Sequence, residues 1–144
     1  MENKEKIAVS ACLVGKNVKY DGTNNYNQDV IDYIKDKEVI LICPEVLGGL
    51  TIPRIPCEII NGKVINQKGI DLTQQFADGA NKALEMVLKN NIKKVILKAN
   101  SPSCGYKQIY DGSFSHKTIP GNGIFASLLS KYNIEILTEL DLKK

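Results

Sequence analysis

The sequence predicts an α/β fold, in one domain over residues 1–144, with an open, mainly parallel, Rossmann-like sheet of about four strands. Helices should cover both faces, with a small β-hairpin added. Short aliphatic runs alternate with stretches of helical spacing, which is typical of a doubly wound sheet with right-handed crossovers. Three of these runs lead to a cysteine at or after their carboxyl ends. Because parallel strands end at one edge, where such sheets bind ligands, we expect three thiols to gather there.

Length and composition are those of an ordinary globular domain. A domain of 144 residues can bury roughly 68–70% of the surface that its unfolded chain exposes. The net charge of +3 is spread along the chain, so nothing predicts a nucleic-acid partner. No segment approaches the ~20 apolar residues of a membrane span, and the first residues do not resemble a signal peptide. We therefore expect a cytoplasmic protein whose cysteines stay reduced.

The first half of the chain should hold two strands, Lys6–Ala11 and Glu38–Cys43. A polar, Asn-rich loop follows the first strand. Helical spacing then begins near Asn27 or Asp29 and stops before the second strand. The second strand has no polar alternation, which is expected of a central parallel strand covered on both faces.

The middle of the chain begins with an irregular segment, Gly48–Cys57, whose glycines and prolines predict a fixed loop across the sheet edge. Asn61-Gly62 lies between two short apolar runs and is a strong hairpin signal. The longest helix should run from Leu72 to Asn90, opened by a capping box between Asp71 and Gln74. It provides the crossover to the next parallel strand.

The last third should contain two more parallel strands, Val95–Leu97 and Ile134–Thr138. The loop after the first of them turns sharply at Pro102. Ile109–Phe114 is expected to be a short strand or turn. A last helix, with its apolar face between Ile124 and Tyr132, then leads to the final strand.

The cysteines at the three predicted strand ends are Cys12, Cys43 and Cys104. They form no C-x-x-C pair, so a structural zinc knuckle is not expected. Two interpretations remain: three thiolates that converge on a metal, or buried structural cysteines. If metal binds, all-sulfur ligation favours iron–sulfur or zinc. Three protein ligands would leave one coordination position open, as in catalytic metal sites.

Several polar residues occur in the loops that should frame the same edge. Glu45 can be a general base beside a metal-bound substrate or an ordinary surface carboxylate. Ser101 and Ser103 can relay a proton or merely satisfy turn backbone. Arg54 and Lys98 can stabilise developing negative charge or be surface charges.

Two further residues are expected to take no part in the chemistry. Cys57 stands in the Pro-rich segment rather than at a strand end, so we expect an inert core thiol. His116, the single histidine, lies in a polar loop without a partner motif. We expect its side chain to be solvent-exposed.

Seven short motifs resemble, in order, the signatures of the thiouracil desulfidase (TudS) family, long catalogued as a domain of unknown function. They span nearly the whole chain, and the Cys-Pro-Glu and Ser-Pro-Ser-Cys-Gly motifs are the specific ones. The motifs are SACLVG (10–15), YDG (20–22), CPEVLGGL (43–50), TIPR (51–54), SPSCG (101–105), YDG (110–112) and PGNG (120–123).

The resemblance implies an α/β fold and a 4Fe-4S cluster held by Cys12, Cys43 and Cys104. The fourth iron would be free to take sulfur from a thiolated base such as 2-thiouracil, giving the oxo base and sulfide without net redox chemistry. Glu45 would activate the attacking water, and Ser101 would donate or relay a proton. The candidate substrate contacts are Asp21, Arg54, Lys98 and Ser103.

The expected partner is therefore a small thiolated pyrimidine, with no need for nucleic acid or a membrane. Two other classes stay open. A sulfur-carrier or redox iron–sulfur protein would need only the three thiolates and would tolerate the loss of Glu45. A thiol-based regulatory or binding module would need no iron.

Overall fold

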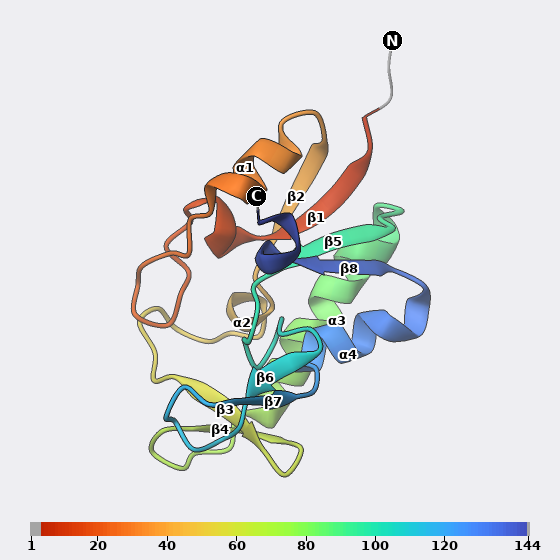
Figure 1. The fold of residues 1–144 in the computed structure, drawn as a ribbon. Helices are drawn as coiled ribbons and strands as arrows, with labels where there is room; N and C mark the ends of the chain where they lie inside the picture. Colours follow the sequence, from red (N-terminus) through yellow and green to blue (C-terminus); the bar gives the residue numbers. More distant parts are fainter. Residues whose placement is uncertain (1–3, 144) are drawn as a thin grey trace.

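The computed structural model describes residues 4–143, and its centre is a parallel sheet. The strands are hydrogen-bonded in the order β2-β1-β5-β8 (Figure 1). Their bounds are β1 (Lys6–Ser10), β2 (Glu38–Ile42), β5 (Lys94–Leu97) and β8 (Glu135–Thr138). The predicted α/β fold with about four parallel strands is confirmed.

Helices cover both faces of this sheet, as predicted. One face packs against α1 and the C-terminal 3-10 turn η3, the other against α3 and α4 (Figure 1). Within β1 the side chains alternate, with Ile7 and Val9 in the first core and Ala8 in the second. The bounds are α1 (Gln28–Ile34), η3 (Glu139–Leu142), α3 (Thr73–Lys89), and α4 (Ile124–Leu129) continued by η2 (Ser130–Tyr132).

Two antiparallel hairpins extend the fold beyond the carboxyl ends of the parallel strands (Figure 1). The predicted hairpin at Asn61-Gly62 is confirmed, with both turn residues in the left-handed region at φ 51° and 78°. The second hairpin was predicted only as a short strand or turn. The hairpin strands are β3 (Cys57–Ile60) with β4 (Lys63–Asn66), and β6 (Gln108–Tyr110) with β7 (Thr118–Pro120).

The prediction that the second strand is central was wrong. β2 is an edge strand, and only Ile42 in it is buried. The central strands are β1 and β5, whose side chains from Ile7 to Ser10 and from Val95 to Leu97 are all buried. An aliphatic run predicts that the two faces of a strand are covered. It carries no information on how many strands lie beside that strand in the sheet.

Local details at three element ends also differ from the prediction. The expected capping box of α3 does not form, because Asp71 Oδ1 accepts from Thr73 N at 2.9 Å while Gln74 bonds Asp78. The first strand ends at Ser10, since the 3-10 turn η1 (Ala11–Val14) follows. The second ends at Ile42, since the single-turn helix α2 (Pro44–Leu47) follows. Among the described residues no helix is long and apolar enough to span a membrane.

Candidate active site

A cavity of about 430 Å³ opens at the carboxyl ends of the parallel strands. Cys12, Cys43 and Cys104 all line it, each delivered by the segment after a different strand. The chain leaves β1 toward β2 on one side and returns to β5 on the other, so the cavity lies at the switch point where open α/β sheets bind ligands. We call it the cysteine cavity. The predicted convergence on one edge is confirmed.

Cys43 is held by the packing of α2 against α3. It is the N-cap of α2, and Pro44 is the first helical residue, a position where proline loses no hydrogen bond. A Cβ on Gly79 would overlap Pro44 O, and one on Gly48 would overlap Gln75 O. The two backbones therefore approach so closely that only glycine fits, which fixes where Cys43 lies.

Cys12 is fixed by the loop that follows it. Its carbonyl oxygen accepts from Asn25 N at 2.9 Å. Burial raises the pKa of the Cys12 thiol, and hydrogen bonding from the Asn25 side chain partly opposes that shift. The Asn-rich loop, which showed no periodic pattern, thus supplies a contact to a candidate ligand.

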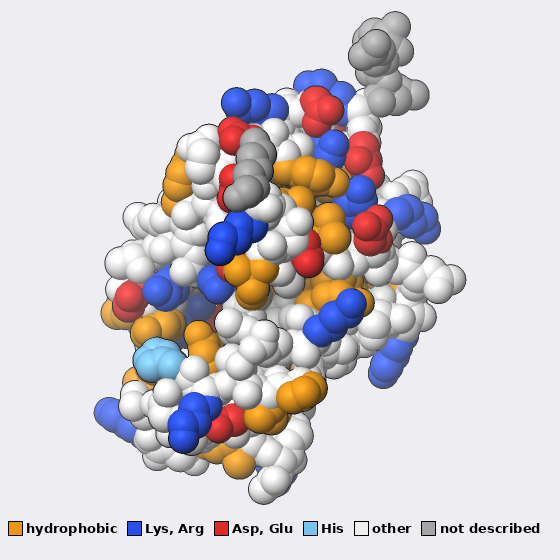
Figure 2. Space-filling model, in the orientation of Figure 1, with side chains coloured by type: hydrophobic (Ala, Val, Ile, Leu, Met, Phe, Trp, Pro, Cys, Tyr) orange, Lys and Arg blue, Asp and Glu red, His pale blue; other side chains and the backbone are white. Residues whose placement is uncertain are grey.

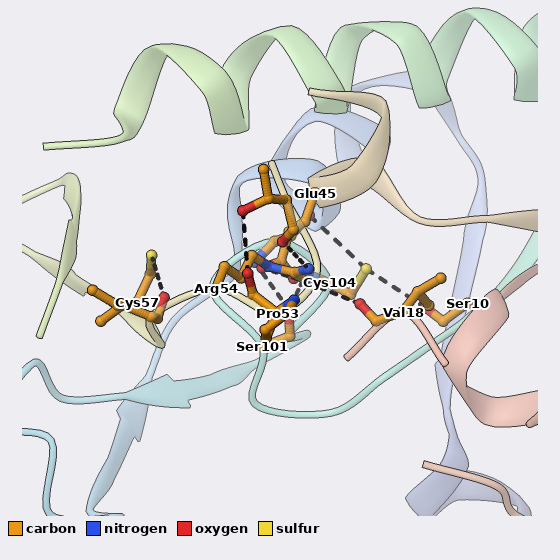
Figure 3. Close-up of polar contacts among 11 residues, drawn as sticks. Ser10, Val18, Glu45, Pro53, Arg54, Cys57, Ser101 and Cys104 are labelled. Atoms are coloured by element: carbon orange, nitrogen blue, oxygen red, sulfur yellow. Dashed lines mark hydrogen bonds and ion pairs between the residues drawn. The ribbon is translucent and has the colours of Figure 1, made fainter. Parts of the chain in front are cut away.

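Cys104 is buried inside a network of hydroxyl groups. Ser10 Oγ donates to Cys104 Sγ at 3.6 Å and accepts from Lys98 N at 3.1 Å. Ser101 Oγ accepts from the backbone N–H groups of Ser103 at 3.1 Å and Cys104 at 3.0 Å (Figure 3). Ser10 was missed as a site residue; its only sequence signal was its place at the start of the SACLVG motif.

Burial raises the pKa of all four thiols above the usual range. Cys12 and Cys43 each raise the pKa of Cys104 further, because neighbouring thiolates repel. None of the four cysteines is in a disulfide. Residues 4–143 contain no group of three His, Cys, Asp or Glu side chains that could hold a single metal ion.

Cys57 also lines the cysteine cavity, at the start of β3, and packs against Val64 and Phe76. Burial raises its pKa to about 11, with charge interactions from Glu45 and Arg54. In Figure 3 its side chain lies well apart from that of Cys104.

Glu45 forms an ion pair inside the cavity. Its Oε1 lies 3.4 Å from Arg54 Nη2, and the two side chains are 19% and 8% exposed (Figure 3). The guanidinium also donates to Val18 O at 3.0 Å and Thr51 O at 3.2 Å. Burial raises the pKa of Glu45, and the Arg54 charge opposes that shift. Arg54 thus holds the carboxylate while joining two loops of the cavity rim.

Lys98 is oriented by a residue from the end of the chain. Its Nζ lies 3.0 Å from Glu139 Oε2, and the other oxygen of Glu139 accepts from Ala99 N at 2.7 Å. Lys98 lines the cavity, and its charge lowers the pKa of Cys12, against the larger effect of burial. Glu139 was missed, because nothing local in the sequence pairs it with Lys98.

Asp21 and Ser103 are not brought to the cavity. The Asp21 side chain is exposed and accepts from Thr23 N at 3.0 Å, although its neighbour Tyr20 does line the cavity. Ser103 is fully buried beside Cys104, and its carbonyl oxygen accepts from Phe125 N at 2.8 Å. The structure gives both residues structural contacts instead.

His116 is exposed, as predicted, but it lines the rim of the cysteine cavity together with Tyr110 and Phe114. Sequence reasoning assigned none of these three to the site. The available signal was the second Tyr-Asp-Gly motif, whose tyrosine is Tyr110.

The chain matches known proteins over almost its whole length. A family model described as 2-thiouracil desulfurase matches residues 7–141. The uncharacterized protein YbbK of Bacillus subtilis (strain 168) is 38% identical over 146 aligned positions, covering 94% of this chain and 97% of that protein. A solved structure of a [4Fe-4S]-dependent thiouracil desulfidase, TudS, superposes with a TM-score of 0.90 at 39% identity, covering 96% of this chain and 93% of that chain. The chain belongs to the 2-thiouracil desulfurase family.

Proposed function

We propose that this single-domain chain acts in the cytoplasm as a [4Fe-4S]-dependent desulfidase. It would convert a thiolated pyrimidine such as 2-thiouracil to the oxo base and sulfide. Family membership and the likeness to TudS support C–S bond cleavage. The observation that carries the proposal is that Cys12, Cys43 and Cys104 line one cavity together with Glu45 and Ser101.

The donor set of the cavity fits the cluster. Three thiols from separate strand ends face one space, none of them is in a disulfide, and thiolates are the ligands that iron–sulfur clusters use. Cys12, Cys43 and Cys104 would hold the cluster through their three thiolates. When bound, a cluster with three protein ligands supplies a Lewis-acidic iron with an open position for sulfur.

Glu45 is suited to activate water. It lies in the cavity, only 19% exposed, and forms an ion pair with Arg54 Nη2 at 3.4 Å. That ion pair favours the charged carboxylate, which can accept a proton from a water molecule attacking the thiolated carbon.

Ser101 is suited to donate a proton. A serine hydroxyl has two acceptor lone pairs and one donor hydrogen. Two backbone N–H groups, those of Ser103 and Cys104, already point at Ser101 Oγ. The O–H of Ser101 therefore remains available as a donor. Because Ser101 lines the cavity, this O–H can donate a proton to the substrate.

Lys98 supplies positive charge to the same space. Its ammonium is anchored by Glu139 at 3.0 Å and by Ala99 O at 2.9 Å. A fixed cation at the cavity wall stabilises the negative charge that develops as sulfide separates from carbon.

Anaerobic purification followed by three measurements tests the proposal: iron per chain, acid-labile sulfide per chain, and conversion of 2-thiouracil to uracil with release of sulfide. We expect about four irons per chain, as in a 4Fe-4S cluster, and turnover without added reductant. A full cluster without turnover would support a sulfur-carrier or redox protein instead. Absence of iron after reconstitution would support a thiol-based binding module.

A further inference from the structure

One wall of the cysteine cavity is formed by residues that the proposed chemistry does not use. Tyr110 ends β6, and Phe114 and His116 follow in the connection to β7; all three line the cavity. We call residues 110–116 the aromatic loop. The single histidine is the pale blue side chain in Figure 2, at the molecular surface with hydrophobic atoms beside it. Aromatic rings beside a cavity for a planar substrate form a surface for stacking.

The aromatic loop has an unusual and closely packed backbone. Phe114 and His116 have φ angles of 57° and 62°, in the left-handed region that bulky side chains seldom adopt. Gly112 has φ 94°, and a Cβ there would lie 2.7 Å from Ile60 Cγ1. The ring of His116 meets that of Tyr110 edge-to-face, with centroids 6.0 Å apart. Contacts with β3 and within the loop therefore determine the conformation of the loop and the orientation of its rings.

A buried carboxylate of the neighbouring hairpin holds the loop in this conformation. Glu58, on β3, is 8% exposed. Its Oε1 accepts from Gly112 N at 2.9 Å and from Phe114 N at 3.1 Å. Two charge-assisted hydrogen bonds in a buried place restrain the backbone at Gly112 and Phe114.

We propose that the aromatic loop binds the pyrimidine ring, that Phe114 is the surface on which the ring stacks, and that Glu58 positions Phe114. This inference rests on the proposed function, because it concerns the substrate of the same site. With the substrate sulfur directed at the cysteines, the π face of the ring needs an apolar partner, and Phe114 is the apolar ring of the loop. The site then selects planar heteroaromatic thiones over saturated thiocarbonyl compounds.

The test is a calorimetric titration of the cluster-loaded protein with uracil and with 5,6-dihydrouracil, which has the same polar groups on a saturated, non-planar ring. We expect the wild type to bind uracil more tightly. Phe114→Ala should weaken uracil binding about 5- to 140-fold, the range for losing one base–aromatic stack, and should leave dihydrouracil binding nearly unchanged. Phe114→Leu, which keeps apolar bulk without a ring, should also lose the preference for uracil.

Ile119→Ala is the matched control. Ile119 lies on β7 of the same hairpin and is 44% exposed, but it lies outside the cysteine cavity, so uracil affinity should not change. Glu58→Gln keeps an acceptor oxygen and should retain most of the affinity. Glu58→Ala should lower it, and adding Phe114→Ala to Glu58→Ala should then cost much less than Phe114→Ala alone.

Equal uracil affinity in the wild type and Phe114→Ala, with equal iron content and thermal stability, would overturn the inference. So would a cluster-loaded wild type that binds neither uracil nor 2-thiouracil. If uracil binding depends on Phe114 but the protein cannot desulfurate 2-thiouracil, the proposed function would be wrong and the ring-binding site would still be supported. Desulfuration of 2-thiouracil that does not depend on Phe114 would support the proposed function and contradict the ring site.

Discussion

The cysteine cavity has two walls that are built by different means. On the strand-end wall, Cys12, Cys43 and Cys104 lie in the segments that follow β1, β2 and β5, and the parallel pairing of these strands brings the segments to one edge. On the hairpin wall, Cys57 and the aromatic loop depend on contacts between two hairpins, above all those of Glu58. The parallel sheet thus brings the proposed ligands to one edge, whereas the hairpins shape the opposite side of the cavity. The same thiol group should therefore behave differently on the two walls.

The largest expected difference between the walls is in iron content. Cys104→Ala removes one of three proposed ligands and should abolish cluster retention, while Cys57→Ala should leave iron and sulfide per chain unchanged. Both thiols are buried, at 5% and 9% exposure, so the substitutions are matched in burial. Iron and sulfide are assayed after anaerobic reconstitution. Equal iron loss in both variants would add Cys57 to the ligand set, and the two walls would then not differ in metal binding.

The next largest effect should come from Glu45, on the strand-end wall beside Cys43. Glu45→Gln keeps size and hydrogen bonding but removes the charge, so 2-thiouracil turnover should fall by about 10²–10⁴ with the cluster spectrum intact. The control is Glu38→Gln, because that glutamate is 60% exposed on β2. Wild-type turnover by a fully loaded Glu45→Gln protein would remove Glu45 from the mechanism and favour a sulfur carrier.

A smaller effect should follow from disturbing the support of the strand-end wall. Gly79→Ala places a Cβ against Pro44 O, and backbone atoms cannot move aside easily. The free energy of unfolding should fall by about 1–3 kcal/mol, as in other overpacked sites. Lys82→Ala, on the exposed side of the same helix, should change it by less than about 0.5 kcal/mol. Urea unfolding measures both; equal stability of the two variants would mean that α2 can shift away from α3.

The smallest effect concerns the chemical reactivity of Cys57 in metal-free protein. Its pKa of about 11 lies above the usual range because of burial, so the thiol is almost wholly protonated at pH 8. Since the thiolate is the reactive form, alkylation by iodoacetamide should speed up about tenfold per pH unit until the pH nears that pKa. Peptide mass spectrometry follows each cysteine separately. A rate at Cys57 that levels off below pH 9 would contradict its burial.

The strand-end wall could be predicted from the sequence because its signals are local. Three aliphatic runs predict the strands, each run is followed by one of the candidate ligands Cys12, Cys43 and Cys104, and parallel pairing brings the ends of the strands together. The position of β2 at the edge of the sheet could not be predicted from such local signals. Whether a run is flanked by one strand or two depends on the strand order, which only the folded chain shows.

The hairpin wall could not be predicted because its determinants are distant in the sequence. The bonds of Glu58 reach Gly112 and Phe114, 54 and 56 residues further on. The loop that receives them has no hydrophobic period, so His116 looked like an ordinary exposed side chain. The Lys98–Glu139 pair was hidden for the same reason, since ion pairs leave no pattern in a single sequence.

The anchoring of Lys98 by Glu139 also matters for biosynthesis. A nascent chain that has emerged only as far as β5 already carries Cys12, Cys43 and the strand before Cys104, but it lacks the carboxylate that fixes Lys98 and Ala99, 40 residues after the latter. Such a chain therefore presents Cys12 and Cys43 before Glu139 can anchor Lys98. A chain shortened after Thr138 lacks the same carboxylate and leaves Lys98 without its ion pair.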